Sequence, residues 1–193
     1  MTRRRRLLAP PAVSVRLSAA DLTTAERLDD ARVEQRRGRR RRACGMTAAV
    51  VATAVVGAIG TAPRSSWFRG LEKPSWYPPD RAFAPVWTVL YASIAWSGTR
   101  ALNAAPATGR VRLRRRIALD LGLNAAWTWT FFRAKRPGLA LGTIVALDAV
   151  NVSLVRESAR HDPVAAVALL PYAAWTAFAT ALTEEIWFRN TDR

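Results

Sequence analysis

Side chains that commonly build catalytic and metal sites are nearly missing from this sequence of 193 residues. Cys44 is its single cysteine, which excludes an intrachain disulfide and a thiolate cluster, and His161 is its single histidine. With no pair of histidines and no Cys-x-x-Cys-His motif, the sequence predicts neither a protein-built zinc site nor a haem held by two histidines. It also shows no nucleophile paired with a base and no phosphate-binding loop, which argues against the commonest enzyme classes.

Acidic residues are scarce as well, with 14 Asp and Glu against 30 Lys and Arg. Residues 1–42, the N-terminal arm, hold 13 arginines and 5 acids. Residues 43–193 are mostly apolar, and their charges stand in short clusters between apolar stretches. This pattern is typical of a membrane protein that crosses the bilayer several times, and basic clusters beside apolar spans are expected there. We therefore do not expect a nucleic-acid partner.

Five apolar stretches follow the arm. They lie near 46–62, 84–102, 117–132, 137–156 and 163–187. Each is close to the length of about 17–25 residues that crosses a bilayer as a helix. The sequence therefore predicts an all-α fold, an integral membrane bundle of five transmembrane helices over residues 43–193. The arm is expected to be disordered in preference to forming a helix on the membrane surface.

Basic residues are unequally divided between the two sides of the predicted bundle. The side that carries the arm also carries the arginine-rich segment 103–116 and Arg156 and Arg160, and it is the richer in Lys and Arg. The positive-inside rule then places the N-terminus in the cytoplasm. Lysine is rare and alanine frequent, which we associate with a GC-rich bacterial genome, so we expect the bacterial cell membrane.

The fourth span contains an acid, Asp148, with Asn151 three residues later on the same helical face. An acid inside a membrane span is costly and normally faces the bundle or a partner. The functional interpretation is a proton site or a subunit contact. The structural interpretation, which we favour slightly, is a hydrogen-bonded acid that joins two helices.

Aromatic residues recur at helical spacing on three spans, together with an asparagine, a proline and an alanine. These sets are Phe83, Trp87 and Tyr91; Asn124, Trp127 and Phe131; and Pro171, Trp175 and Ala179. If the three faces converge, they form an apolar cavity with aromatic walls and a few polar groups. The alternative is that these aromatic residues serve in packing or in the belts at the membrane interfaces.

Three sequence segments resemble the tryptophan-rich sensory protein and translocator protein family. They are WFRGLEKPSWYPP at 67–79 followed by FAPVWTVLY at 83–91, LNAAW at 123–127 followed by FF at 131–132, and PYAAW at 171–175 followed by FAT at 178–180 and Asn190. The matches stand in the family's order and spacing and leave only the arm uncovered.

The resemblance implies binding of porphyrin-type tetrapyrroles, such as protoporphyrin, by a membrane receptor, sensor or transporter. It implies a ligand-binding site made of Phe83, Trp87, Tyr91, Asn124, Trp127, Phe131, Tyr172, Trp175 and Ala179. Arg69, Lys73 or Arg81 are expected to meet the propionates of a porphyrin at the mouth of the site. We expect no metal and no cofactor other than this ligand.

Two alternatives stay open beside the receptor. One is a light-dependent enzyme that degrades porphyrin, with Trp87 or Trp175 relaying an electron, and the other is a structural scaffold. Small residues on the first span, including Ala48 and Ala52, allow a homodimer. Sterol binding is doubtful, because the tyrosine of the cholesterol-recognition pattern is missing before Arg189.

Overall fold

The computed structural model describes residues 19–191, with side chains from residue 27 onward. Over these residues every regular element is helical. The elements are α1 (Ala19–Gly60), α2 (Ser66–Gly70), α3 (Asp80–Ala104), α4 (Ala107–Thr128), the π-helical turn η1 (Trp129–Arg133), α5 (Pro137–Ala159) and α6 (Pro163–Arg189). The predicted all-α class is confirmed.

Helix α1 extends further toward the N-terminus than the first predicted span. It begins at Ala19 and continues without a break through the arm, which was expected to be disordered. Residues 19–37 contain no proline or glycine and are rich in Ala, Arg, Leu and Glu, all strong helix formers. The chain divides into two units between Gly38 and Arg39, close to the predicted boundary at residue 42. Residues 1–18 of the arm lie outside the described part.

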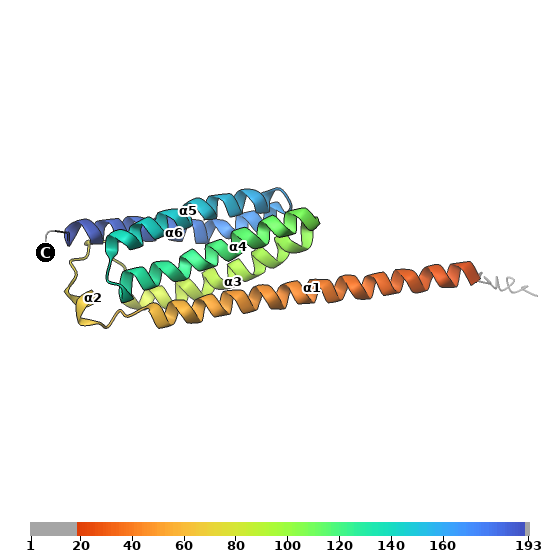
Figure 1. Ribbon diagram of the computed structural model, residues 1–193, viewed down its shortest axis with the longest axis horizontal. Coiled ribbons are helices and arrows are strands. Elements are labelled where there is room, and N and C mark those ends of the chain that lie inside the picture. The colour runs from red at the N-terminus through yellow and green to blue at the C-terminus, as the bar shows by residue number, and fades with distance from the viewer. Residues whose placement is uncertain (1–18, 192–193) are drawn as a thin grey trace, which may run out of the picture. The chain divides into compact units, whose positions relative to one another are not determined.

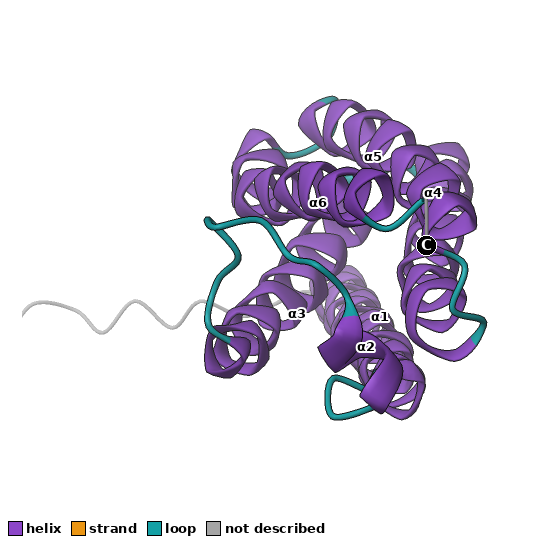
Figure 2. Ribbon diagram, turned by 90° about the vertical axis from the view of Figure 1, so that its left-hand side faces the viewer, coloured by secondary structure: helices purple, strands orange, loops and turns teal. Residues whose placement is uncertain are grey.

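The unit that begins at Arg39 is a bundle of antiparallel neighbours. In Figure 1, α3, α4, α5 and α6 run side by side, and the segment with α2 lies at one end. The packed pairs are α5 with α6, α4 with α5, α3 with α6 and α3 with α4. Figure 2 views this unit end-on and shows α2 and its flanking loops lying across that end. Short connections between long helices favour such antiparallel packing.

All five predicted spans coincide with helices of the bundle. Within the described part of the chain, three segments are long and apolar enough to cross a membrane by length and composition, namely Arg27–Gly60, Pro137–Ala159 and Pro163–Arg189. Helices α3 and α4 have 25 and 22 residues and so also have a sufficient length. The charge on α4 lowers its mean hydropathy, because five arginines stand among its first ten residues. The protein is thus an all-α membrane bundle.

Proline marks the start of every long helix after α1. Pro79 and Pro106 precede α3 and α4, while Pro137 and Pro163 are the first residues of α5 and α6. Proline suits these positions because its fixed φ matches a helix and its missing N–H would have no partner in the first turn.

The third span ends in a π-helical turn instead of a plain α-helix. Within η1 the N–H of Ala134 donates to the carbonyl of Trp129 at 2.9 Å, which closes a wider turn. The chain then reverses through Lys135, whose φ is +53°. This positive φ ends the helix before Pro137 begins the next.

The polar residues of α5 inside the bundle bind α6. Thr180 donates from Oγ1 to Asp148 Oδ2 at 2.7 Å, and Asn151 donates from Nδ2 to Thr176 Oγ1 at 3.0 Å. Asn151 and Thr176 are buried. These contacts favour the structural interpretation, in which Asp148 and Asn151 join two helices.

A buried carboxylate holds the end of the bundle opposite α2. Glu157, at the end of α5, is 1% exposed and pairs with Arg112 at 2.9 Å and Arg160 at 2.9 Å, with Arg116 at 3.7 Å. These ion pairs join α4 to α5. One buried acid thus pairs with three arginines, whose side chains remain partly exposed to solvent.

Asp162 caps α6 at the same end. Its side chain accepts from the N–H of Ala165 at 3.1 Å and pairs with Arg100 of α3 at 2.7 Å. Burial acts to raise the pKa of Asp162, but these backbone N–H groups and the Arg100 guanidinium outweigh it and hold the pKa below its usual value. The cap therefore contributes both to the start of α6 and to its contact with α3.

Candidate functional site

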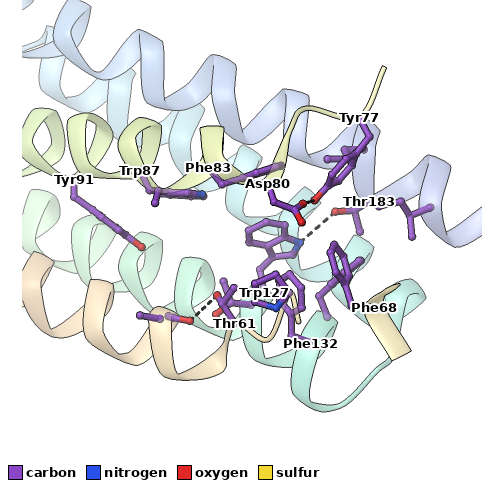
Figure 3. A pocket seen from close by; sticks show the side chains of 18 residues that line it. Thr61, Phe68, Tyr77, Asp80, Phe83, Trp87, Tyr91, Trp127, Phe132 and Thr183 are labelled. Carbon is purple, nitrogen blue, oxygen red and sulfur yellow. Dashed lines mark hydrogen bonds between the residues drawn. The ribbon is translucent and has the colours of Figure 1, made fainter. Parts of the chain in front are cut away.

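A cavity of about 430 Å³ lies at the end of the bundle that α2 crosses. Its 18 lining residues come from α1, α2, α3, α4, η1, α6 and the loops on either side of α2. Eight of these residues are aromatic. This volume falls in the range of roughly 300–1,000 Å³ that small-molecule sites occupy, and such sites combine apolar walls with few polar groups. Figure 3 shows the cavity with its labelled side chains.

Helix α3 supplies one wall through residues spaced four apart. Phe83, Trp87 and Tyr91 all line the cavity, as their helical spacing predicts. The Trp87 ring lies 5.3 Å from the Tyr91 ring and 6.4 Å from the Trp127 ring, with an angle of 34° between the ring planes in each pair. In Figure 3 these three side chains of α3 follow one another and face Trp127 and Phe132.

Helix α4 and its π-helical turn supply the facing wall. Trp127, Phe131 and Phe132 line the cavity together with Thr128. Trp127 and Thr128 reach the cavity from the last turn of α4, and Phe131 and Phe132 reach it four residues later from η1. The rings of these two phenylalanines pack edge-on at 5.0 Å. The last turn of α4 and the π-helical turn after it thus each present two consecutive residues to the cavity.

Small residues of α1 complete the wall between α3 and α4. Gly57 lines the cavity, and a Cβ there would lie 3.7 Å from the Tyr91 hydroxyl. One turn later, a Cβ at Gly60 would lie 2.7 Å from a ring carbon of Trp129. Trp129 in turn donates from Nε1 to the carbonyl of Val56 at 3.0 Å. The absence of a side chain at Gly60 therefore lets α1 approach Trp129, whereas a Cβ at Gly57 would make an ordinary van der Waals contact.

The segment between α1 and α3 covers the end of the cavity. Phe68 of α2 is buried, lines the cavity, and packs 5.0 Å from Phe132. Lys73 lies 4.5 Å from the Phe68 ring centroid and donates to the Phe68 carbonyl at 2.8 Å. Asn190, at the end of α6, accepts from the N–H of Glu72 and donates to the carbonyl of Glu72, each at 3.0 Å. These contacts fix the cover to α6 and to η1.

Polar groups on the cavity wall are few. Trp127 donates from Nε1 to Thr183 Oγ1 at 3.3 Å, and the Tyr77 hydroxyl donates to Asp80 Oδ1 at 2.8 Å. Burial, with the hydrogen bond to Asp80 and its negative charge, raises the pKa of the Tyr77 hydroxyl. The indole N–H of Trp87 has no acceptor among the described residues. It is therefore available to a ligand.

A chain of hydrogen bonds leads from the cavity wall into the bundle. Tyr91 donates to Asn124 Oδ1 at 3.1 Å, Asn124 donates to the Tyr172 hydroxyl at 3.2 Å, and Tyr172 donates to Asp120 Oδ2 at 3.2 Å. Asn124, Tyr172 and Asp120 are all buried. Asn124 thus contacts a cavity residue without lining the cavity. Asp120 was not among the predicted site residues, although an acid within a predicted span was a signal that could have found it.

Residues predicted on α6 lie mostly behind the cavity. Tyr172 belongs to the buried chain above, and Trp175 packs 5.9 Å from the ring of Phe83 instead of lining the cavity. Ala179 is buried in a cluster with Ile144 and Leu147 of α5. The α6 residues that do line the cavity are Leu182, Thr183 and Ile186.

The cations expected at the mouth stand outside the lining. Arg69 and Arg81 are exposed, and Lys73 is engaged with the α2 segment through its bonds to the carbonyls of Phe68 and Leu71. The charged residue that lines the cavity is an acid, Asp80. A ligand carboxylate would therefore meet a cation only at the outer rim.

Comparison with known proteins identifies the family of this chain. Residues 46–188 match the TspO/MBR family. This chain belongs to that family. It is 35% identical to the translocator protein of Sus scrofa over 130 residues, which cover 66% of this chain and 76% of the relative. It is 34% identical to the tryptophan-rich protein TspO of Archaeoglobus fulgidus over 149 residues, 74% of this chain and 92% of the relative.

A third relative carries the name of a sensory protein. The tryptophan-rich sensory protein of Cereibacter sphaeroides is 30% identical over 127 residues, 66% of this chain and 78% of the relative. Membership of the TspO/MBR family identifies the chain as a multi-pass membrane protein and supports a receptor or sensor role. The match begins at Met46, the first buried residue of α1 along the described chain, so the arm lies outside it.

Proposed function

We propose that this protein is a membrane receptor, sensor or transporter that binds a porphyrin-type tetrapyrrole in the aromatic cavity. The observation that carries the proposal is the pair of facing rings, Trp87 and Trp127, whose planes are inclined by 34°. A planar macrocycle gains about 0.5–1.5 kcal/mol per aromatic pair beyond the burial of its area. Flat apolar walls therefore suit a porphyrin better than a flexible polar molecule.

The polar groups of the cavity favour a metal-free ring. The lining contains no histidine, cysteine or methionine, the side chains that most often bind haem iron. His161 lies instead against Gly109 and Glu157 at the opposite end of the bundle. The Trp87 N–H and the Asp80 carboxylate offer a donor and an acceptor to a ligand. The propionates would remain at the rim, near Arg69 and Arg81.

We further propose that the cavity opens on the non-cytoplasmic side. The arginine-rich start of α4 and the end of α5 lie at the opposite end of the bundle from the cavity, and basic residues prefer the cytoplasmic face. The membrane would be the bacterial cell membrane, with the N-terminus in the cytoplasm.

The test is a titration of the full-length purified protein with protoporphyrin, in darkness and under illumination. Binding is followed by porphyrin fluorescence anisotropy and pigment loss by absorbance. We expect saturable binding of one porphyrin per cavity in darkness, with the pigment intact. Absence of saturable binding would contradict the proposal. Illumination that bleaches one pigment per protein, and fails to do so in a Trp87→Phe variant, would instead support the degrading enzyme.

A further inference from the structure

Arginines from two helices gather around the end of α3, on the side of the bundle away from the cavity. Arg42 of α1 donates from Nε to Asn103 Oδ1 at 2.6 Å. Arg110 of α4 donates from Nη1 to the carbonyl of Ala105 at 2.7 Å. The two acceptors are two residues apart, so the last turn of α3 and the residue that follows it hold both guanidinium groups.

Two further arginines extend this group. Arg39 stands three residues before Arg42 on α1, and Arg114 stands four residues after Arg110 on α4. Arg39, Arg110 and Arg114 all lie close enough to Arg42 to repel it electrostatically. We call these four residues the α1–α4 arginine cluster. Arg42 and Arg110 are half-buried, while Arg39 and Arg114 are exposed.

No acid among the described residues forms an ion pair with this cluster. The neighbouring arginines of α4 differ in this respect, because Arg112 and Arg116 both pair with the buried carboxylate of Glu157. Four like charges held together without a counterion repel one another and so destabilise the arrangement. An anion placed between them would remove this repulsion and form charge-assisted hydrogen bonds.

We propose that the α1–α4 arginine cluster binds the phosphate of an anionic membrane lipid. Guanidinium groups match phosphate oxygens in pairs, and the cluster presents groups from two helices toward one place. The apolar surface that begins beside it supports a lipid over a soluble anion. On α1, Ala49 and Val56 are exposed and lie on the same side of the helix as Arg42, seven and fourteen residues further on, where they would contact the acyl chains of a lipid bound by its headgroup.

The experiment measures lipid binding to the delipidated full-length protein in a neutral detergent. Native mass spectrometry follows the bound fraction during titration with phosphatidylglycerol, with phosphatidylcholine or with inorganic phosphate. We expect phosphatidylglycerol to bind more tightly than phosphatidylcholine. Each basic residue near a membrane surface contributes about 1 kcal/mol, which corresponds to roughly a fivefold change in affinity. Arg114→Gln should therefore weaken phosphatidylglycerol binding about fivefold, and Arg110→Gln together with Arg114→Gln about 25-fold.

Arg115→Gln is the matched control, because Arg115 is an exposed neighbour of Arg114 without an ion pair among the described residues. It removes the same charge from the same helix turn and should leave affinity nearly unchanged. Arg114 is exposed, so its variant keeps the fold, which a thermal unfolding curve without lipid verifies. Equal losses of phosphatidylglycerol affinity for Arg114→Gln and Arg115→Gln would mean that only the overall positive charge matters, and would contradict a defined binding site. Inorganic phosphate that displaces the lipid at similar concentration would overturn the lipid assignment.

Discussion

Replacing Trp87 by phenylalanine is expected to weaken porphyrin binding while leaving the bundle folded. Trp87 lines the cavity between Tyr91 and Trp127 and offers the indole N–H that no described residue accepts. Phenylalanine keeps an aromatic ring at the same place on α3. It removes the second ring of the indole and the N–H group, and nothing else.

The magnitude follows from these two losses. The smaller ring gives up roughly 40 Å² of apolar contact, which at about 25 cal/mol per Å² is about 1 kcal/mol. Losing one hydrogen bond to the ligand costs about 0.5–1.5 kcal/mol more. The sum of about 1.5–2.5 kcal/mol corresponds to a dissociation constant raised roughly 10- to 70-fold.

The assay is a dark titration with protoporphyrin followed by porphyrin anisotropy, with helicity checked by circular dichroism. Trp96→Phe is the control, because Trp96 also belongs to α3 but is 51% exposed, lies outside the cavity lining, and has Arg100 over its ring at 5.3 Å. It should bind porphyrin like the unmodified protein. Trp175→Phe should have a smaller effect than Trp87→Phe, because Trp175 acts only through its contact with Phe83. Equal affinities for Trp87→Phe and Trp96→Phe would refute the reasoning.

Three further outcomes are expected. Glu157→Gln should lower the free energy of unfolding by about 2 kcal/mol, as measured by chemical denaturation in detergent. This is less than the roughly 3–5 kcal/mol typical of a broken buried ion pair, because the arginines that pair with Glu157 are partly exposed. Since the folded-state pKa of Asp162 is lowered, its stabilising effect is present above the ordinary aspartate pKa and is lost as the pH falls through the folded-state value. Thermal unfolding should therefore differ between the unmodified protein and Asp162→Ala near neutral pH and converge in acid. In a cysteine-free variant, Ser75→Cys should react with an impermeant thiol reagent from outside and Thr108→Cys should not, and reversed labelling would contradict the orientation.

The wall on α3 could be predicted from the sequence because helical spacing alone decides which residues share a face. Phe83, Trp87 and Tyr91 stand four apart, and all three line the cavity. No knowledge of the neighbouring helices was needed for this. The apolar parts of the helices followed equally directly, because each predicted span is bounded by charged residues or prolines that end an apolar run. The starts of α1 and α4 did not, because both helices extend through arginine-rich segments before the apolar run.

The face of α6 could not be predicted in the same way. This helix is apolar on nearly all sides because it packs against both α3 and α5, so its sequence does not distinguish the side toward the cavity. The cavity also lies near the end of α6, at Leu182, Thr183 and Ile186, while the recognisable motif is centred on Trp175. Thr183, which follows this motif by eight residues, is one of the lining residues.

Contacts between residues far apart in the sequence also could not be predicted. The pairing of Asn190 with Glu72 brings together residues 118 positions apart, and it fixes the segment that covers the cavity. The π-helical turn has no glycine or proline inside it that would announce it. Phe132 lines the cavity from this turn, four residues after Thr128.

If the cavity between α1, α3 and α4 holds the porphyrin, a side chain that fills this cavity should block binding. Gly57→Val directs added methyl groups into the cavity, since the Cβ alone would lie 3.7 Å from the Tyr91 hydroxyl. Gly142→Val makes the same change on α5, where a Cβ meets nothing within 4 Å. Both replace a helical glycine by valine, so their effects on helix propensity match. In a dark protoporphyrin titration, Gly57→Val should lose about five- to 150-fold in affinity by overfilling the site, while Gly142→Val retains full affinity. Unchanged binding in Gly57→Val would contradict the account.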